Sequence, residues 1–273
     1  MKKILIITDA WEPQVNGVVT TMTTVVKKLK EKNFKVEVIH PGMFHTFPLP
    51  NYPEISVAWN FWDLKKKIEK FDADYMHISV EGPLGVTGRH YCLENNIPYT
   101  TCIHTKFPEY VYERFGIGLD VTKGLLKWFH NPAAKTLVNT ISHREELEQD
   151  GFTDLVLWSR GFDEKIFYPC SDGGKKKYLL YVGRVAVEKN IEEFLKMPSH
   201  LPKVVVGGGP SLKSYAKKYP DVDFVGFKKG KELADYYRDA ACFVFPSLTD
   251  TFGIVLIEAL ACGTPLAGFN VTG

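Results

Sequence analysis

The sequence of 273 residues lacks several patterns that mark other classes of protein. Its five cysteines show no C-x-x-C spacing and mostly lie in or beside apolar segments, which argues against a disulfide framework or a zinc site. We therefore expect reduced thiols and a cytoplasmic protein. No apolar run approaches the roughly 18 residues of a membrane-spanning helix. The net charge of only +2 argues against a protein that neutralises many nucleic-acid phosphates.

The amino-terminal segment lacks the apolar length of a signal peptide. Its apolar run is Ile4–Ile7, and Asp9 follows closely, so the segment predicts a first strand. Apolar, β-rich runs then alternate with helical patterns, which is typical of parallel sheets built from βαβ units. The first half is predicted to form strands at 4–8, 35–39, 74–78, 99–103, 137–141 and 155–158, a helix at 17–29 and a proline-marked loop at 40–52.

A polar stretch rich in glycine and lysine, Tyr168–Lys177, is typical of a linker and predicts a domain boundary. A second α/β series follows, with strands expected at 178–182, 203–206, 222–225, 242–245 and 265–268 and helices at 191–197, 212–218, 232–240 and 254–261. The fold class predicted is therefore α/β, with two Rossmann-like domains, residues 1–168 and 169–273. A cleft between two such domains is a natural ligand site.

Two glycine-containing turns follow predicted strands. Gly17 opens the first helix, where the missing side chain and the helix N-terminus favour an approaching anion. Gly208 is the middle of three successive glycines, which allow a nucleotide base or ribose to come close to the backbone. Either pattern also fits an ordinary turn, so neither assigns a function by itself.

A basic pair follows the predicted strand 178–182. Arg184 comes directly after Gly183, and Lys189 lies just before the next predicted helix. An arginine can fork onto phosphate oxygens, a lysine adds a point charge, and the helix dipole adds to both. These residues are candidates for binding a diphosphate. The alternative is a solvated basic loop whose charges pair with neighbouring glutamates.

Two carboxylates, Asp250 and Glu258, stand eight positions apart near the carboxyl end of the chain. Asp250 lies in the loop after the predicted strand 242–245, and Glu258 lies on the apolar helix that follows. Ionised carboxylates accept hydrogen bonds from sugar and ribose hydroxyls. The alternative is a helix-capping acid plus one surface glutamate. A lone acid on an apolar helix is costly unless it binds something, which favours a ligand for Glu258.

His104 follows the predicted strand 99–103, and Glu81 follows the strand before it. Since the carboxyl ends of parallel strands meet at one edge, both residues are expected there. A single histidine is more often structural than catalytic, so His104 is a candidate and no more on these grounds.

In this order the segments resemble the glycosyltransferases of family 4, which have the GT-B fold and use nucleotide sugars. The resemblance extends along essentially the whole chain, and its last part is an acidic signature whose usual form is Glu-x7-Glu. The supporting segments are Asn16-Gly17, Pro48–Ile55, Glu81–Gly85, His104–Tyr110, Trp158–Gly161 with Asp163, Gly183–Asn190, Gly207–Pro210 and Asp250–Pro265.

This resemblance implies a retaining transfer of a hexose from a UDP- or GDP-sugar donor to a lipid or a cell-envelope glycan. It implies that the two domains face each other across the cleft and that the donor binds mainly to the second. Arg184 and Lys189 would bind the diphosphate, with help from backbone near Gly17, and Gly208 would adjoin the nucleotide. No cofactor and no metal is expected, because two cations can stabilise the leaving group. No Asp-x-Asp motif lies in a setting suited to a Mg²⁺-bridged diphosphate.

The resemblance also assigns the remaining polar residues. Glu258 would bind the ribose, Asp250 would contact the transferred sugar, and His104 would lie beside the reacting face of that sugar. The sequence departs from the family pattern in having aspartate at position 250, which shortens the reach of the carboxylate by one methylene. Family members continue beyond Gly273, so the second domain is expected to be incomplete. A nucleotide-sugar-binding protein without transferase activity is the alternative function.

Aromatic residues beside lysines raise the possibility of peripheral contact with a membrane. Trp59, Phe61 and Trp62 precede Lys65–Lys67, and this combination suits the interface of a bilayer. An ordinary amphipathic helix packed on the sheet is the simpler interpretation. If the contact exists, the protein is expected at the cytoplasmic face of a membrane.

Overall fold

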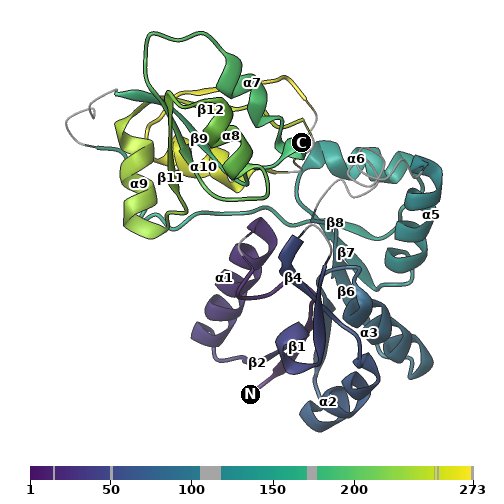
Figure 1. Ribbon diagram of the computed structural model, residues 1–273. Coiled ribbons are helices and arrows are strands. Elements are labelled where there is room, and N and C mark those ends of the chain that lie inside the picture. Colours follow the sequence, from purple (N-terminus) through teal and green to yellow (C-terminus); the bar gives the residue numbers. More distant parts are fainter. Residues whose placement is uncertain are drawn as a thin grey trace. The chain divides into compact units, whose positions relative to one another are not determined.

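The structure is a computed structural model that describes residues 1–14, 16–49, 52–104, 118–170, 177–248, 250 and 252–271. The chain divides into two compact units, Met1–Ser159 and Arg160–Gly273 (Figure 1). The division lies upstream of the boundary expected from the linker. Phe167 explains the difference, because it packs in the core of the second unit against Tyr237. Each unit is described by itself below.

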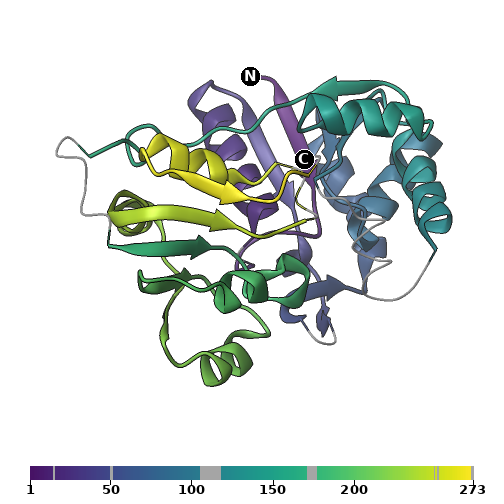
Figure 2. The same ribbon diagram turned by 90° about the horizontal axis from the view of Figure 1, so that it is seen from above.

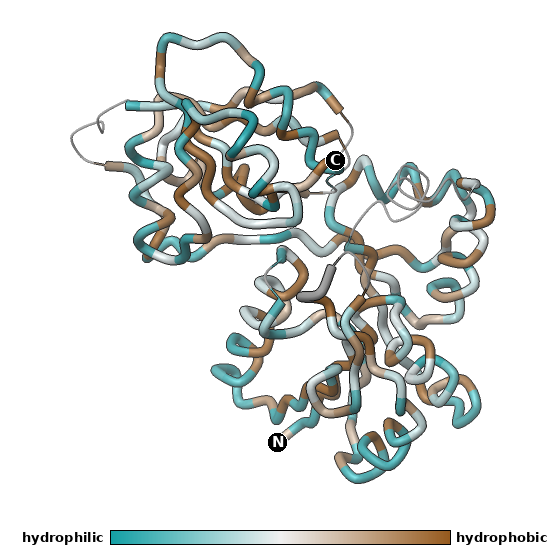
Figure 3. Tube along the Cα trace, in the orientation of Figure 1, coloured by the Kyte–Doolittle hydropathy of each residue, from teal (hydrophilic) through white to brown (hydrophobic). Residues whose placement is uncertain are grey.

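The first unit is built on one parallel sheet with the strand order β2-β1-β5-β6-β7-β8. Every pair of neighbouring strands in it is parallel. Several side chains of the central strands are fully buried, including Leu5, Ile7 and Ile78, and hydrophobic residues concentrate along these strands (Figure 3). The strands are β1 (Lys3–Ile7), β2 (Lys35–Ile39), β5 (Tyr75–Ile78), β6 (Tyr99–Cys102), β7 (Lys135–Val138) and β8 (Leu155–Leu157).

The crossover helices of this unit are α1 (Gly17–Glu31), α2 (Leu64–Phe71), α3 (Pro83–Glu94), α5 (Leu119–His130) and α6 (Ile141–Gln149). Helix α1 begins at Gly17 because the Asn16 side chain accepts a hydrogen bond from the Val19 N–H. The predicted strand 137–141 is wrong at its carboxyl end. There the Thr140 hydroxyl accepts from the His143 N–H and starts α6 instead.

The proline-marked segment 40–52 is not a plain loop. It contains a 3-10 turn, Pro41–Met43, and the strand β3 (Thr46–Leu49), which pairs with β4 (Tyr52–Ala58) in an antiparallel hairpin. Pro48 is accommodated because a two-stranded ribbon leaves one side of each strand without a partner.

The second unit is built on a five-stranded sheet with the order β11-β10-β9-β12-β13, again parallel throughout. Figure 2 shows its green-to-yellow strands running in the same direction. The strands are β9 (Tyr178–Val182), β10 (Lys203–Val206), β11 (Val222–Gly226), β12 (Ala240–Phe245) and β13 (Leu266–Gly268). The helices are α7 (Ile191–Lys196), α8 (Leu212–Lys218), α9 (Gly230–Asp239) and α10 (Ile254–Ala261). The predicted fold class is thus confirmed.

The glycine-rich turn after β10 lies directly against the turn after β9. A Cβ atom on Gly207 would come within 1.9 Å of the Gly183 carbonyl oxygen, whereas a Cβ on Gly208 would meet nothing within 4 Å. The Val185 N–H donates to the Gly208 carbonyl at 2.9 Å and joins the two turns. Gly207 is therefore needed for packing, and Gly208 has open space beside it.

The substitutions Gly207→Ala and Gly208→Ala form a matched pair that tests this packing. Gly207→Ala should lower the free energy of unfolding by roughly 2–4 kcal/mol, because its φ of 139° and the carbonyl contact both oppose a side chain. Gly208→Ala should change it by less than about 0.5 kcal/mol. Urea denaturation followed by circular dichroism measures both. Equal losses for the two variants would contradict the packing described.

Candidate functional site

The polar motifs of both units gather at the carboxyl edges of the parallel sheets, where the strand order reverses. In the first unit, β2 lies on one side of β1 and β5 on the other. In the second, the chain runs from β9 outward through β10 and β11 and then returns to place β12 beside β9. Ligands of open α/β sheets bind at such switch points.

An ion pair spans the switch point of the second unit. Lys189 ends the 3-10 turn after β9, and its ammonium group lies 2.7 Å from Asp250 Oδ1 in the loop after β12. The two side chains are 27% and 26% exposed, so the pair is partly shielded from water. The Asn190 side chain donates to the Pro246 carbonyl at 3.1 Å and joins the same two loops. The structure thus brings two of the predicted residues together.

Two buried polar atoms in the loop that carries this ion pair have no hydrogen-bond partner among the described residues. They are Asp250 Oδ2 and the hydroxyl of Ser247, which is 3% exposed. Buried polar atoms in proteins are usually paired, so such a couple calls for an explanation, and a bound ligand supplies one. Ser247 was not identified from the sequence, although its place directly after an apolar strand was a usable signal.

Arg184 lies at the carboxyl end of β9, in the same turn as Gly183. The Tyr181 hydroxyl donates to the Arg184 carbonyl at 2.8 Å and fixes the backbone of this turn. The arginine side chain is partly buried. Gly208, in the adjoining turn, also has open space beside it. These residues border the same end of the second sheet as the Lys189–Asp250 pair.

Glu258 lies on α10 and is only 9% exposed, so it is not the surface glutamate of the alternative interpretation. The hydroxyl of Tyr237, on α9, donates to Glu258 Oε2 at 3.1 Å. Burial raises the pKa of Glu258 to about 7, and the bond from Tyr237 offsets only part of that rise. A ligand hydroxyl donating to this carboxyl group would stabilise its charged form. The sequence did not reveal Tyr237 as its partner.

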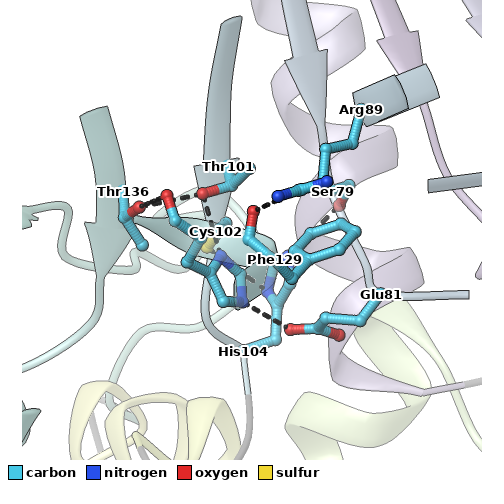
Figure 4. A network of polar contacts seen from close by, with 9 residues as sticks. Ser79, Glu81, Arg89, Thr101, Cys102, His104, Phe129 and Thr136 are labelled. Carbon is cyan, nitrogen blue, oxygen red and sulfur yellow. Dashed lines mark hydrogen bonds and ion pairs between the residues drawn. The ribbon is translucent and has the colours of Figure 1, made fainter. Parts of the chain in front are cut away.

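In the first unit, His104 follows β6 and lies against the end of β5. Its Nε2 atom is 3.2 Å from the Ser79 hydroxyl, and its Nδ1 atom is 3.8 Å from Cys102 Sγ. Figure 4 shows Ser79, Cys102 and His104 at this edge together with Glu81. The imidazole is thus held by groups from two neighbouring strands. Gly17 is at the amino end of α1, exposed, next to the Asn16 cap.

Asp9, after β1, is a partly buried carboxylate that the sequence analysis did not single out. The N–H groups of Leu84 and Gly85, in the first turn of α3, donate to it at 3.0 and 3.1 Å. Burial raises the pKa of Asp9 to about 6, although these two amides oppose the rise. A Cβ on Gly82 would come within 2.3 Å of its carboxyl carbon. Asp9 therefore fixes the start of α3.

The described residues contain no group of three or more His, Cys, Asp or Glu side chains placed to hold a metal ion. Two Asp-x-Asp triplets occur in the sequence, Asp72–Asp74 and Asp221–Asp223. They precede or begin β5 and β11, at the amino ends of those strands, away from the edge that carries the candidate site. Within the described part of the chain, no helix is long and apolar enough to cross a membrane.

Comparisons with known proteins agree on one family. Residues 15–165 match "Glycosyltransferase Family 4", and residues 164–273 match "Glycosyl transferases group 1". The chain is 26% identical over 302 residues to a GDP-mannose-dependent alpha-mannosyltransferase of Corynebacterium glutamicum. The alignment covers 99% of this chain and 73% of that protein. It is 23% identical over 320 residues to the alpha-monoglucosyldiacylglycerol synthase of Streptococcus pneumoniae, covering 97% and 70%.

Solved structures show the same fold at low sequence identity. A sucrose-phosphate synthase from Thermosynechococcus elongatus superposes with a TM-score of 0.78 at 20% identity, covering 100% of this chain and 82% of that one. WaaG, a glycosyltransferase involved in lipopolysaccharide biosynthesis, gives a TM-score of 0.67 at 14% identity, covering 98% and 82%.

The raised pKa of Glu258 predicts a specific pH dependence of stability. Between pH 4.5 and 7 Glu258 is ionised in the unfolded chain but still protonated in the folded one. The free energy of unfolding of the unmodified protein therefore falls as the pH rises through this range. We compare the free energy of unfolding of Glu258→Gln with that of the unmodified protein. The variant minus the unmodified protein should rise by about 2 kcal/mol from pH 5 to pH 8, because only the unmodified protein carries the ionisable group. Urea denaturation at both pH values measures the difference. A difference that does not change with pH would show that folding does not raise the pKa of Glu258, and would contradict its burial as a carboxyl group with a raised pKa.

Proposed function

The chain belongs to glycosyltransferase family 4, and we propose that it transfers a hexose from a UDP- or GDP-sugar to a lipid or cell-envelope glycan acceptor. It is a glycosyltransferase with the fold of that class. The observation that carries the proposal is the Lys189–Asp250 pair at the switch point of the second sheet, with Asp250 Oδ2 buried and unpaired beside it. A cation for a diphosphate and an acceptor for a sugar hydroxyl are adjacent there.

The donor is proposed to bind to the second unit. Arg184 and Lys189 bind the diphosphate, since both lie in the turn after β9 where this sheet reverses. Gly208 leaves space for the nucleotide. Glu258 accepts hydrogen bonds from the hydroxyl groups of the ribose, and these bonds offset the cost of burying its charge.

The remaining roles concern the sugar. Asp250 Oδ2 accepts a hydrogen bond from a hydroxyl of the transferred hexose. The family resemblance further assigns His104 to the reacting face of that sugar and the backbone near Gly17 to the diphosphate. Transfer proceeds with retention of configuration and without a metal ion. Its main catalytic contribution is stabilisation of the departing diphosphate by the two fixed cations.

The names of the relatives support both substrate classes. Three of them are GDP-mannose-dependent alpha-mannosyltransferases, which favours GDP-mannose as donor. Two are alpha-monoglucosyldiacylglycerol synthases, which favours a lipid acceptor. With such an acceptor the protein would act at the cytoplasmic face of a membrane.

An aromatic surface on the first unit supports that location. Trp59, Phe61 and Trp62 are 49%, 38% and 60% exposed, and their rings contact one another. Lys65 and Lys66 follow them with side chains that are 65% and 83% exposed. Apolar rings beside exposed lysines suit the interface of an anionic bilayer.

A thermal-shift titration with UDP, GDP and ADP tests the donor site. We expect one nucleotide to raise the melting temperature, because it binds only the folded protein. Lys189→Ala should weaken the binding of that nucleotide at least about tenfold, since the substitution removes a cation and leaves the charge of Asp250 to repel the diphosphate. Lys213→Ala, an exposed lysine on α8, is the control and should bind normally. Failure of all three nucleotides to bind would overturn the proposed function.

Flotation with lipid vesicles tests the membrane surface. The protein should bind phosphatidylglycerol vesicles more strongly than phosphatidylcholine vesicles, and Trp62→Ala should reduce binding severalfold by removing the most exposed ring. Phe227→Ala removes a ring that is 50% exposed on the second unit and should have no effect. Equal binding by the two variants would argue against this surface.

A further inference from the structure

A buried histidine in the first unit, His130, bonds to the carboxylate of Glu81, which has no role in the proposed function. His130, the last residue of α5, is 1% exposed. Its Nδ1 atom lies 2.9 Å from the Thr101 hydroxyl, and its Nε2 atom lies 3.0 Å from Glu81 Oε1. The Thr101 hydroxyl is in turn 2.9 Å from that of Thr136. The chain of contacts runs from β7 through β6 and α5 to the loop after β5.

The chemistry of these groups fixes the direction of their hydrogen bonds. An ionised carboxylate only accepts, so Nε2 carries the proton and donates to Glu81. In the neutral ring Nδ1 then accepts from Thr101, and Thr101 accepts from Thr136, whose hydroxyl also lies 3.4 Å from the His130 carbonyl oxygen. The inner groups are satisfied by one another. In the part of the chain that the structure describes, Glu81 Oε2 is the one end of this network without a protein partner.

Glu81 lies at the edge of the sheet where His104 lies. Ile78 pairs with Thr101 in the parallel register of β5 and β6, so Glu81 and His104 each stand three residues beyond paired positions. The Ser79–His104 contact shows that the two strand ends run together, and Figure 4 shows Glu81 beside them. The Glu81 side chain is 23% exposed. Since Oε1 is bonded to the buried His130, we infer that Oε2 carries this exposure and is available to a ligand at the edge where His104 lies.

The backbone of Glu81 is held as firmly as its side chain. Gly82 follows it directly and packs on the Asp9 carboxyl group, where a Cβ would not fit. Asp9 also accepts hydrogen bonds from the Leu84 and Gly85 N–H groups, which anchor the first turn of the helix that begins after Glu81. A carboxylate with a fixed backbone, a fixed side-chain oxygen and a free outer oxygen is preorganised for binding.

We propose that Glu81 binds a hydroxyl group of the sugar or glycerol acceptor, and that His130 is the positioning residue that holds it. The inference rests on the proposed function. A hydroxyl donor matches an acceptor-only carboxylate, whereas the phosphates of the donor would be repelled by Glu81 and the nearby Asp9. The site therefore selects the neutral, hydroxyl-bearing acceptor over a second nucleotide.

The substitution Glu81→Gln tests the contact by reversing the polarity of the outer atom. His130 Nε2–H retains the amide oxygen on the inside, so the NH₂ group faces the acceptor where an oxygen is needed. With GDP-mannose and UDP-glucose as donors and dioctanoylglycerol and octyl α-mannoside as acceptor probes, the acceptor KM should rise at least about tenfold, a loss of about 1.4 kcal/mol. Hydrolysis of the donor by water and the nucleotide thermal shift should not change. Glu94→Gln, an exposed glutamate on α3, is the matched control.

Variants of His130 separate positioning from folding. His130→Leu should raise the acceptor KM in the same way, and His130→Gln, which can still donate to Glu81, should recover part of it. An acceptor KM for Glu81→Gln within twofold of the unmodified value, with transfer intact, overturns the inference alone. Unmodified protein that neither binds a nucleotide nor hydrolyses a donor overturns the proposed function and this inference with it.

Discussion

The parallel direction of the strands is the constraint on which the candidate residues of each unit depend. Neighbouring parallel strands need a crossover, so residues that follow two adjacent strands are distant in sequence and close in space. Lys189 and Asp250 are separated by 61 positions, and Ser79 and His104 by 25, yet each pair is within hydrogen-bonding distance. The helices between them set how far apart those strand ends lie.

The hydrogen-bond partners of two carboxylates, and not their burial, separate the structural Asp9 from the candidate ligand-binding Glu258. Burial raises the pKa values of both groups. Asp9 accepts hydrogen bonds from two backbone N–H groups at the start of α3, and capping this helix accounts for its carboxylate. Glu258 receives the Tyr237 hydroxyl, and burial raises its pKa to about 7. A strongly perturbed acid at the motif-bearing end of a sheet is a better candidate for ligand binding than one that already caps a helix.

The sequence predicted the second unit better than the first, for a physical reason. Strands buried on both faces read as apolar runs, and β9, β10, α8 and α10 have the predicted bounds. Helix α3 was not predicted, because Gly85 and Gly88 weaken its helical pattern. Those glycines allow close packing: a Cβ on Gly85 would come within 2.0 Å of the Val80 carbonyl oxygen. Sequence motifs pointed to Lys189 and Asp250 as candidates. They did not point to Tyr237, which bonds to Glu258, or to His130, which bonds to Glu81, because these contacts form between elements that are distant in sequence.

Aspartate at position 250, in place of the glutamate usual in the family, has a consequence for the proposed reaction. Its Oδ1 atom is bonded to Lys189, so the cation that would meet the diphosphate is held in place before the donor binds. Its Oδ2 atom is unpaired and would face the sugar. One short carboxylate then fixes both the group that stabilises the leaving phosphate and the group that orients the hexose. Since catalysis of this kind depends on preorganised charges, such a shared anchor would, in the proposed reaction, link donor recognition directly to departure of the diphosphate.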